Sequence, residues 1–268
     1  MSKSVRFVAL LSGVLLLISP VTMCFAEEGN SPRWDGFYTG LTAGYSAAKF
    51  SMSSRTSLTS TGYNPGAGTY WNDHTNAGRV SATGSGNLFS NDTMAGAVFG
   101  YNLRLGNSQL TGVELDLSAL GANETTTRAT SYPSLLTRSP QTTFRTSAEN
   151  FGALAIKYGT LVNDTLFYVK GGPAMSKISF SSNFSDGVAS ESNARSETKM
   201  GWMFGLGVEH KVQNNVSIKA EYIHANFGSI SNTSNNLSQP GINYINQPFQ
   251  SSLQVRLDIL RIGVNMSF

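Results

Sequence analysis

The 268-residue sequence predicts an all-β protein in which eight antiparallel strands close into an up-and-down β-barrel that spans a membrane. The last nine residues, LRIGVNMSF, alternate between apolar positions and polar or glycine positions, which is typical of a β-strand. After residue 26 no apolar run is long enough for a membrane-spanning helix, so a chain that crosses a membrane needs a closed barrel. Short and long polar connections alternate between the candidate strands, as they do in such barrels.

The first 26 residues have the organisation of a secretory signal peptide. Lys3 and Arg6 supply a positive start, and the apolar stretch from Phe7 to Ile18 follows them. This stretch is shorter than the ~20 residues that a membrane-spanning helix needs, which disfavours that alternative. A small-residue motif that ends at Ala26 marks the expected cleavage point, so we predict a signal peptide at 1–26.

The predicted barrel occupies residues 27–268, and its composition excludes several classes of protein. Cys24 is the one cysteine and lies in the signal peptide, so a disulfide-rich module is excluded; a lipid anchor on Cys24 is a less favoured alternative. The 19 basic residues include Lys3 and Arg6, so the exported chain is nearly balanced against its 16 acidic residues. We therefore expect no nucleic-acid partner. The 27 glycines, with abundant Ser, Thr and Asn, fit a β-rich outer-membrane protein.

The eight predicted strands are recognised by alternation and by the connections between them. Three connections are tight and four are long, which is expected when the two sides of a barrel face the periplasm and the outside. The predicted strands are 34–50, 93–105, 110–120, 149–159, 165–175, 200–210, 215–225 and a last one that ends at 268. The tight turns are predicted around 106–107, 163–164 and 213–215, and the long polar stretches at 51–90, 122–146, 181–198 and 229–250.

Proline placement agrees with this division, with one exception. Proline lacks the N–H that a ladder needs, so it is expected outside central strands. Pro173 falls inside the fifth predicted strand, which we therefore expect to be shorter or kinked. The prolines in the long connections are at positions 65, 133, 140, 240 and 248.

The charged residues of the strands predict which face points inward. A Lys or Arg that faces lipid at mid-bilayer costs roughly 2–4 kcal/mol, so charges are expected inside and apolar side chains outside. In the third, fourth, sixth, seventh and eighth predicted strands the charged positions have the opposite parity to their apolar neighbours. An eight-stranded barrel has little interior space, so these groups should pair with one another. The predicted lumen network is Glu114, Asp116, Lys157, Lys170, Glu209, Lys219, Glu221 and Arg261.

Four segments resemble one family of small membrane barrels. They are WDGFYTGLTAGY, GYNLRLGNSQLTGVELDL, GWMFGLGVEHKVQNNVSIKAEY and the terminal RIGVNMSF. These segments resemble the outer-membrane immunogenic or surface-antigen proteins of alphaproteobacteria, which are related to the OmpA transmembrane domain. The resemblance implies a bacterial outer-membrane location and a structural, surface-exposed role in the envelope without catalysis.

The resemblance also implies partners and two alternative functions. The last strand with its terminal Phe268 resembles the signal that the barrel-assembly machinery reads. Outer-membrane lipid and lipopolysaccharide are expected around the barrel, and host or environmental ligands at the loops. Some relatives bind hemin and some carry porin-like descriptions, so a ligand-binding loop and a narrow porin are the alternatives. No cofactor is expected.

The histidines are the candidate residues for catalysis, metal binding and hemin binding. Small barrel enzymes pair His with Ser at the outer rim, but Asn226 holds the next same-face position after His224. His74, His210 and His224 are not spaced as metal ligands. For hemin, the first long stretch offers His74, Trp71, Tyr70 and Tyr63 as an imidazole with flat aromatic neighbours, against the simpler interpretation of an exposed polar loop. A secreted soluble sandwich is a further alternative, but it explains the loop asymmetry poorly.

Overall fold

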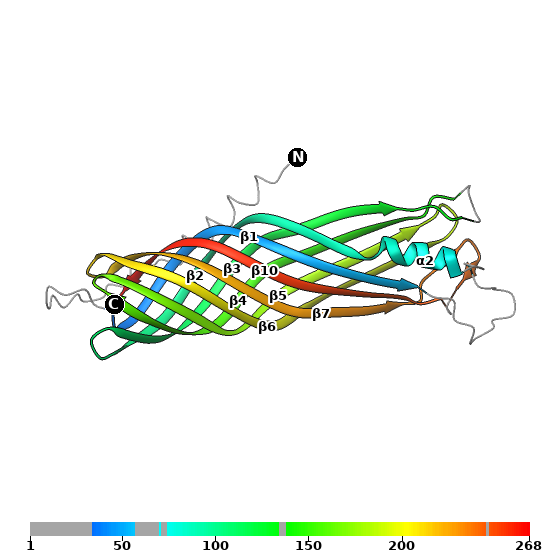
Figure 1. Cartoon of the computed structure of the whole chain (residues 1–268). Coiled ribbons are helices and arrows are strands. Elements are labelled where there is room, and N and C mark those ends of the chain that lie inside the picture. The colour runs from blue at the N-terminus through cyan, green and yellow to red at the C-terminus, as the bar shows by residue number, and fades with distance from the viewer. Residues whose placement is uncertain (1–33, 57–69, 71–73, 134–137, 245–246) are drawn as a thin grey trace. The chain divides into compact units, whose positions relative to one another are not determined.

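Ten β-strands and one helix make up the described part of the chain (Figure 1). The structure is a computed structural model that describes residues 34–56, 70, 74–133, 138–244 and 247–268, all within one unit, Pro32–Phe268. The predicted signal peptide lies outside the described residues. The elements are β1 Gly36–Thr56, α2 His74–Thr83, β2 Gly86–Leu105, β3 Gln109–Ala129, β4 Gln141–Val162, β5 Thr165–Ser185, β6 Ser190–Gln213, β7 Val216–Ser234, β8 Ser238–Gln239, β9 Ile242–Asn243 and β10 Phe249–Ser267.

Eight long strands pair into a closed antiparallel ring. Each strand from β1 to β6 pairs with the next one in sequence, and β10 pairs with both β7 and β1. The all-β, antiparallel prediction is therefore confirmed. The described residues contain ten strands instead of eight, because the short strands β8 and β9 form a small hairpin in the connection after β7.

The three tight connections lie where the sequence predicts them. β2 and β3 are joined through Gly106, which has a φ of 68°, and β4 and β5 through Asn163, which has a φ of 54°. Glycine and asparagine are the residues that adopt this left-handed conformation most readily. We call the end with these turns and the C-terminus the proximal end, and the opposite end, with α2, β8 and β9, the distal end (Figure 1).

The ring strands are longer than predicted, at 19 to 24 residues, and β3 to β7 reach about twice the predicted length. Much of each polar stretch continues the ladder, because Ser and Thr alternate with inward apolar residues and pair across strands. The Thr127 and Thr143 hydroxyls lie 2.9 Å apart, as do those of Ser179 and Ser196. The prediction of four long outer loops is wrong at 181–198, where only residues 186–189 separate β5 from β6.

The first polar stretch contains a helix that the sequence analysis did not predict. Ala77 and Val80 of α2 are buried, and they pack in one cluster with Tyr132 of the next connection. The Ser81 hydroxyl accepts the amide of Thr56 at 2.9 Å and so fixes α2 to the end of β1. Among the described residues, no helix is long and apolar enough to cross a membrane.

Pro173 does not shorten its strand. β5 runs from Thr165 to Ser185, and Pro173 pairs opposite Trp202 of β6. On the other side the recorded β4–β5 pairing stops at Ala153–Ala174 and resumes at Ile156–Gly171. The expectation of a shorter strand is wrong. Proline has no N–H to donate, and Pro173 lies at the gap in the β4–β5 ladder, so the missing donor does not end the strand.

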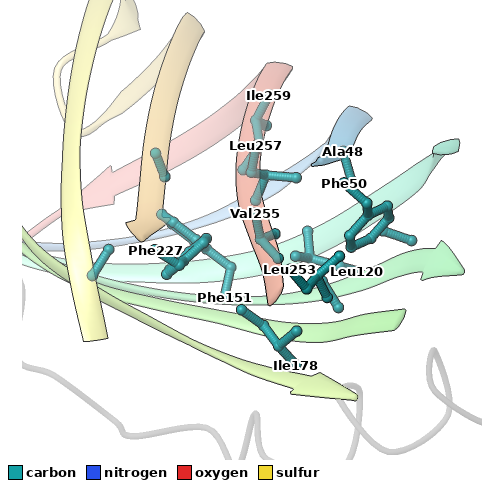
Figure 2. Close-up of a cluster of buried hydrophobic side chains, with 14 of the residues drawn as sticks. Ala48, Phe50, Leu120, Phe151, Ile178, Phe227, Leu253, Val255, Leu257 and Ile259 are labelled. Carbon is teal, nitrogen blue, oxygen red and sulfur yellow. The ribbon is translucent and has the colours of Figure 1, made fainter. Parts of the chain in front are cut away.

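The interior of the ring changes character along its axis. The inward positions of the distal halves hold an apolar cluster, part of which Figure 2 shows with Phe50, Phe151, Ile178 and Phe227 from four different strands. We call this cluster the apolar layer. The sequence analysis placed most of the distal halves in long polar connections, whereas they continue the strands with an apolar inward face and a polar outward face.

Candidate functional site: a buried ionic cluster

The eight charged residues expected in the lumen all lie on inward positions of the ring and are buried, none more than 4% exposed. They come from six strands. Each occupies a position whose side chain points inward, because successive side chains of a strand point to opposite faces of the wall. Four are acidic and four are basic, so the group has no formal net charge. We call it the ionic cluster. Its members are Glu114 and Asp116 of β3, Lys157 of β4, Lys170 of β5, Glu209 of β6, Lys219 and Glu221 of β7, and Arg261 of β10.

Arg261 and Lys170 form the centre of the ionic cluster. The Arg261 guanidinium contacts the Asp116 carboxylate, and its Nε donates to Glu221 Oε2 at 2.7 Å. The Lys170 ammonium lies 2.5 Å from Glu114 and 2.7 Å from Glu221. Glu114 and Glu221 therefore each contact two or more cations, and this arrangement offsets the desolvation of buried charges.

Lys219 and Lys157 extend the ionic cluster on either side of this centre. The Lys219 ammonium lies 3.3 Å from Glu114 and 3.4 Å from Glu221. Lys157 is 3.9 Å from Glu209, whose carboxylate also accepts hydrogen bonds from Ser217 and Asn265. The structure thus links all eight charges through ion pairs or shared partners.

Two buried tyrosines hold the carboxylates in place, and sequence reasoning missed both. The Tyr38 hydroxyl donates to Glu114 at 2.8 Å, and the Tyr168 hydroxyl donates to Glu221 at 2.6 Å. The Lys157 ammonium lies over both rings, at 4.5 Å and 5.1 Å from their centroids. Alternation along the strand could have identified Tyr168, because it lies two positions from Lys170 and therefore on the same face.

Each of these tyrosines packs over a glycine of the neighbouring strand. Tyr38 stands directly opposite Gly100, and Tyr168 directly opposite Gly207. A Cβ on either glycine would overlap the tyrosine ring. The glycines are therefore required by the close approach of the rings, which in turn place the hydroxyls on the ionic cluster.

Apolar groups enclose the ionic cluster at both ends. The apolar layer lies on its distal side. On the proximal side Trp34, Leu110, Leu161, Leu166 and Tyr168 form a smaller buried cluster near the tight turns. The Lys211 ammonium lies 5.2 Å from the Trp34 ring centroid. In the described part of the ring the charges thus occupy a packed interior.

The outward surface divides at the same level as the interior. Large apolar side chains project outward from the proximal halves, for example Ile262 at 70% and Ile156 at 67% exposure. In the distal halves exposed large apolar residues are fewer among those described, for example Phe89, Val188 and Met200. The proximal surface is therefore an apolar belt around the ionic cluster, and the distal surface is polar around the apolar layer.

Of the four hemin candidates the structure describes His74 and Tyr70, so the hemin site stays a prediction. His74 is exposed at the first position of α2. The Tyr70 hydroxyl donates to Asp186 at 2.5 Å and its ring packs on Tyr244, with 5.1 Å between centroids. Trp71 and Tyr63 lie outside the described residues.

Tyr70 belongs instead to a network that ties the distal connections together. Tyr132 also donates to Asp186, at 3.1 Å, and Arg138 donates to the Tyr70 hydroxyl at 2.9 Å. Burial, reinforced by the Asp186 carboxylate, raises the pKa of both tyrosines above the ordinary value of 10.0. We call Tyr70, Tyr132, Arg138 and Asp186 the distal clasp.

The other two histidines have different partners. His210 lies 2.9 Å from the Thr165 hydroxyl. His224 pairs through Nδ1 with Asp258 at 2.8 Å, and Tyr222 donates to the same carboxylate oxygen at 2.6 Å. Sequence reasoning missed Asp258 because it compared His224 with Asn226 on the same strand. No group of three potential metal ligands is present among the described residues.

Comparison with known proteins identifies the family. Residues 75–245 match the family of the outer membrane protein beta-barrel domain. The chain belongs to this family. Its location is therefore the bacterial outer membrane. The resemblance that the sequence indicated is thus confirmed, and the family relation covers the part of the chain from α2 to the end of the β8–β9 hairpin.

The individual proteins that resemble this chain share only a low sequence identity with it. The 31 kDa outer-membrane immunogenic proteins of Brucella melitensis and Brucella suis are each 25% identical over 236 residues, which is 88% of this chain and 84% of theirs. Neisserial surface protein A is 15% identical, with a TM-score of 0.38 over 87% of this chain and 97% of its own. OprG from Pseudomonas aeruginosa is 10% identical, with a TM-score of 0.45 over 89% of this chain and 100% of its own.

Proposed function

We propose that the ring of eight strands is a transmembrane up-and-down barrel and that only its proximal half lies in the outer membrane. The division of the outward surface carries this proposal. Apolar side chains face outward where the interior is ionic, and polar side chains face outward where the interior is apolar. A wall that contacts lipid needs the first arrangement, and a wall that contacts water needs the second.

The strand lengths support this placement. A tilted strand crosses the hydrocarbon core in about 9–11 residues, whereas the ring strands have 19 to 24. About half of each strand therefore extends beyond the bilayer. The tight turns mark the periplasmic side, and the distal half, with α2 and the β8–β9 hairpin, projects outside the cell.

We infer a structural role for this barrel: it is a surface-exposed component of the envelope, it presents its distal half as an antigen, and it has no catalytic activity. The ionic cluster ties six strands together from within, and the apolar layer fills the section above it. We expect such an interior to leave no water-filled path, whereas the porin alternative predicts a conductance that this barrel should lack.

The partners follow from the same arrangement. The apolar belt contacts outer-membrane lipid, and the distal surface contacts lipopolysaccharide and whatever host or environmental molecules reach it. Phe268 donates its amide to Phe37 at 2.9 Å beside the β1–β10 seam. A strand that closes the ring with an aromatic end fits recognition by the barrel-assembly machinery, which would add β10 to a sheet edge.

Cysteine labelling of cells tests the topology. Single cysteines replace Thr127 or Asn183, which are exposed on the distal half, and Asn107 or Asp164, which are exposed in the tight turns. A maleimide that cannot cross the membrane should label the first two in intact cells. It should label the other two only after the cells are broken. Labelling of Asn107→Cys in intact cells would overturn the orientation.

Two further measurements test the closed interior and the barrel itself. In planar bilayers the purified protein should show no steady single-channel conductance, and a stable open level would favour the porin. The folded protein should migrate differently from the boiled chain on a gel and should fractionate with the outer membrane. Recovery of the protein in the culture supernatant would favour the secreted sandwich.

A further inference from the structure

Two cations stand side by side at the distal edge of the apolar belt. Lys49 of β1 and Arg256 of β10 are directly opposite each other in the ladder, and both point outward. Each lies four positions beyond the last belt residue of its strand, since Tyr45 pairs with Leu260 and these two are 69% and 65% exposed. The pair therefore marks the level at which the outward surface changes from apolar to polar.

This pairing is unfavourable by itself. Like charges directly opposite each other on one face of a sheet destabilise it. Within the described part of the chain, neither Lys49 nor Arg256 forms an ion pair. The nearest outward carboxylate along β10, Asp258, accepts hydrogen bonds from Tyr222 and His224. Among the described residues the two cations thus concentrate positive charge without a carboxylate at ion-pair distance.

Cations at a similar level on other strands are arranged differently. Lys177 of β5 lies 3.1 Å from Glu149. Lys199 of β6 lies 3.4 Å from Glu197, which also pairs with Arg195. The Lys49–Arg256 pair therefore differs from these neighbours in having both charges available to an external anion.

The surroundings suit a lipid better than a dissolved ion. The Lys49 ammonium lies 5.7 Å from the centroid of the Phe89 ring, which is 62% exposed. An aromatic ring beside a cation at the membrane surface is typical of the interface between acyl chains and headgroups. Two cations at one height complement a phosphate, which accepts several charge-assisted hydrogen bonds.

We propose that Lys49 and Arg256 bind a phosphate of a phosphorylated glycolipid in the outer leaflet, with its acyl chains on the apolar belt below. This inference rests on the membrane placement proposed above. A bound phosphate neutralises the two like charges, so the site and the lipid stabilise each other. The proposal assigns this seam of the barrel a specific lipid contact, whereas the remainder of the belt needs only acyl chains.

Native mass spectrometry of the full protein in mild detergent tests the site. The probes are lipid A with both phosphates, the same lipid without phosphate, and inorganic phosphate. The double variant Lys49→Gln/Arg256→Gln should retain phosphorylated lipid A about tenfold less than the parent, the size expected for lost charge-assisted contacts. The control Lys177→Gln/Arg145→Gln removes two exposed outward cations as well and should retain the lipid like the parent.

A third variant separates binding from folding. Lys49→Glu places a carboxylate opposite Arg256, so it should fold at least as well as the parent while losing phosphorylated lipid A. Equal retention of the lipid by the parent, the double variant and Lys49→Glu would overturn the proposal. Equal retention of the phosphate-free lipid would also overturn it, as would inorganic phosphate that competes as well as the lipid at equal concentration.

The same samples distinguish this inference from the proposed function. Heat-modifiable migration and outer-membrane fractionation report the barrel and its placement. If both hold and the double variant still retains the lipid, only the lipid site fails. If the parent does not fractionate with the membrane, the proposed function fails first.

Discussion

The proximal and distal halves of the ring are built from the same eight strands but have opposite patterns of polarity. In the proximal half the ionic cluster is inside and the apolar belt outside, and in the distal half the apolar layer is inside and Ser, Thr and charged residues are outside. In β10 the change occurs between Ile259, which is buried, and Leu260, which is 65% exposed. Strand pairing is regular there, so we attribute the difference to the surroundings proposed for each half of the wall.

The two halves also differ in how they are stabilised. Ions inside the proximal half need particular partners at particular distances, as Arg261 does with Asp116 and Glu221. The apolar layer needs volume and shape, as cores of water-soluble proteins do. Substitutions should therefore act by different rules in the two halves, and matched changes along one strand are the sharpest way to test the comparison.

The largest effect is expected in the ionic cluster. Glu114→Ala removes one of the two carboxylates that Lys170 and Lys219 share and should lower the free energy of unfolding by about 3–5 kcal/mol. Denaturant titration followed by gel mobility measures it. The exposed Glu149 makes a solvent-accessible pair with Lys177, so Glu149→Ala should change stability by less than about 1 kcal/mol. Similar losses for both variants would contradict the special role of the ionic cluster.

The next effect tests the outward surface within one strand. Leu115 and Thr125 are both exposed on the outward face of β3, the first in the proximal half and the second in the distal half. Leu115→Arg should cost roughly 2–4 kcal/mol because the charge faces lipid. Thr125→Arg should cost little because it faces water. Equal stability of the two variants in lipid vesicles would contradict the proposed division of the barrel into a lipid-facing half and a water-facing half.

A smaller effect tests the apolar layer against the apolar belt. Ile259 is fully buried and Ile262 is 70% exposed on the same strand. Ile259→Val should lower stability by about 0.5–1.5 kcal/mol, since it opens space in a packed interior. Ile262→Val should lower it less because lipid chains refill the space. Unfolding in micelles of one detergent measures both, and the reverse order would contradict the packing described here.

The smallest effect concerns the distal clasp and alkaline pH. The raised pKa values of Tyr70 and Tyr132 mean that the neutral hydroxyls are favoured in the folded state. Their contribution to stability is therefore complete below about pH 10, the ordinary tyrosine pKa, and is lost as the pH rises through the folded values. Protease cleavage of the distal connections should increase at high pH. In Tyr132→Phe this pH dependence should weaken, and an unchanged dependence would argue against the clasp.

The candidate site shows how far alternation along single strands can predict function-bearing positions. Parity placed Glu114, Lys157 and Arg261 on one face of their strands, because a charge and its apolar neighbours separate between the two sides of a wall. Parity alone did not identify which charges contact each other, since Arg261 and Asp116 are 145 residues apart in sequence. It also did not indicate that Tyr38 would cover Gly100.

The sequence by itself determined the strands of the proximal half, their tight turns and the inward direction of their charges. All of these follow from local features: a period of two, and turn residues such as Asn163 that accept a left-handed conformation. Tertiary structure decided the length of the strands, the apolar layer, the distal clasp and the meeting of Lys49 with Arg256. These depend on register and ring closure, which join residues far apart in the chain and therefore leave little trace in any one segment.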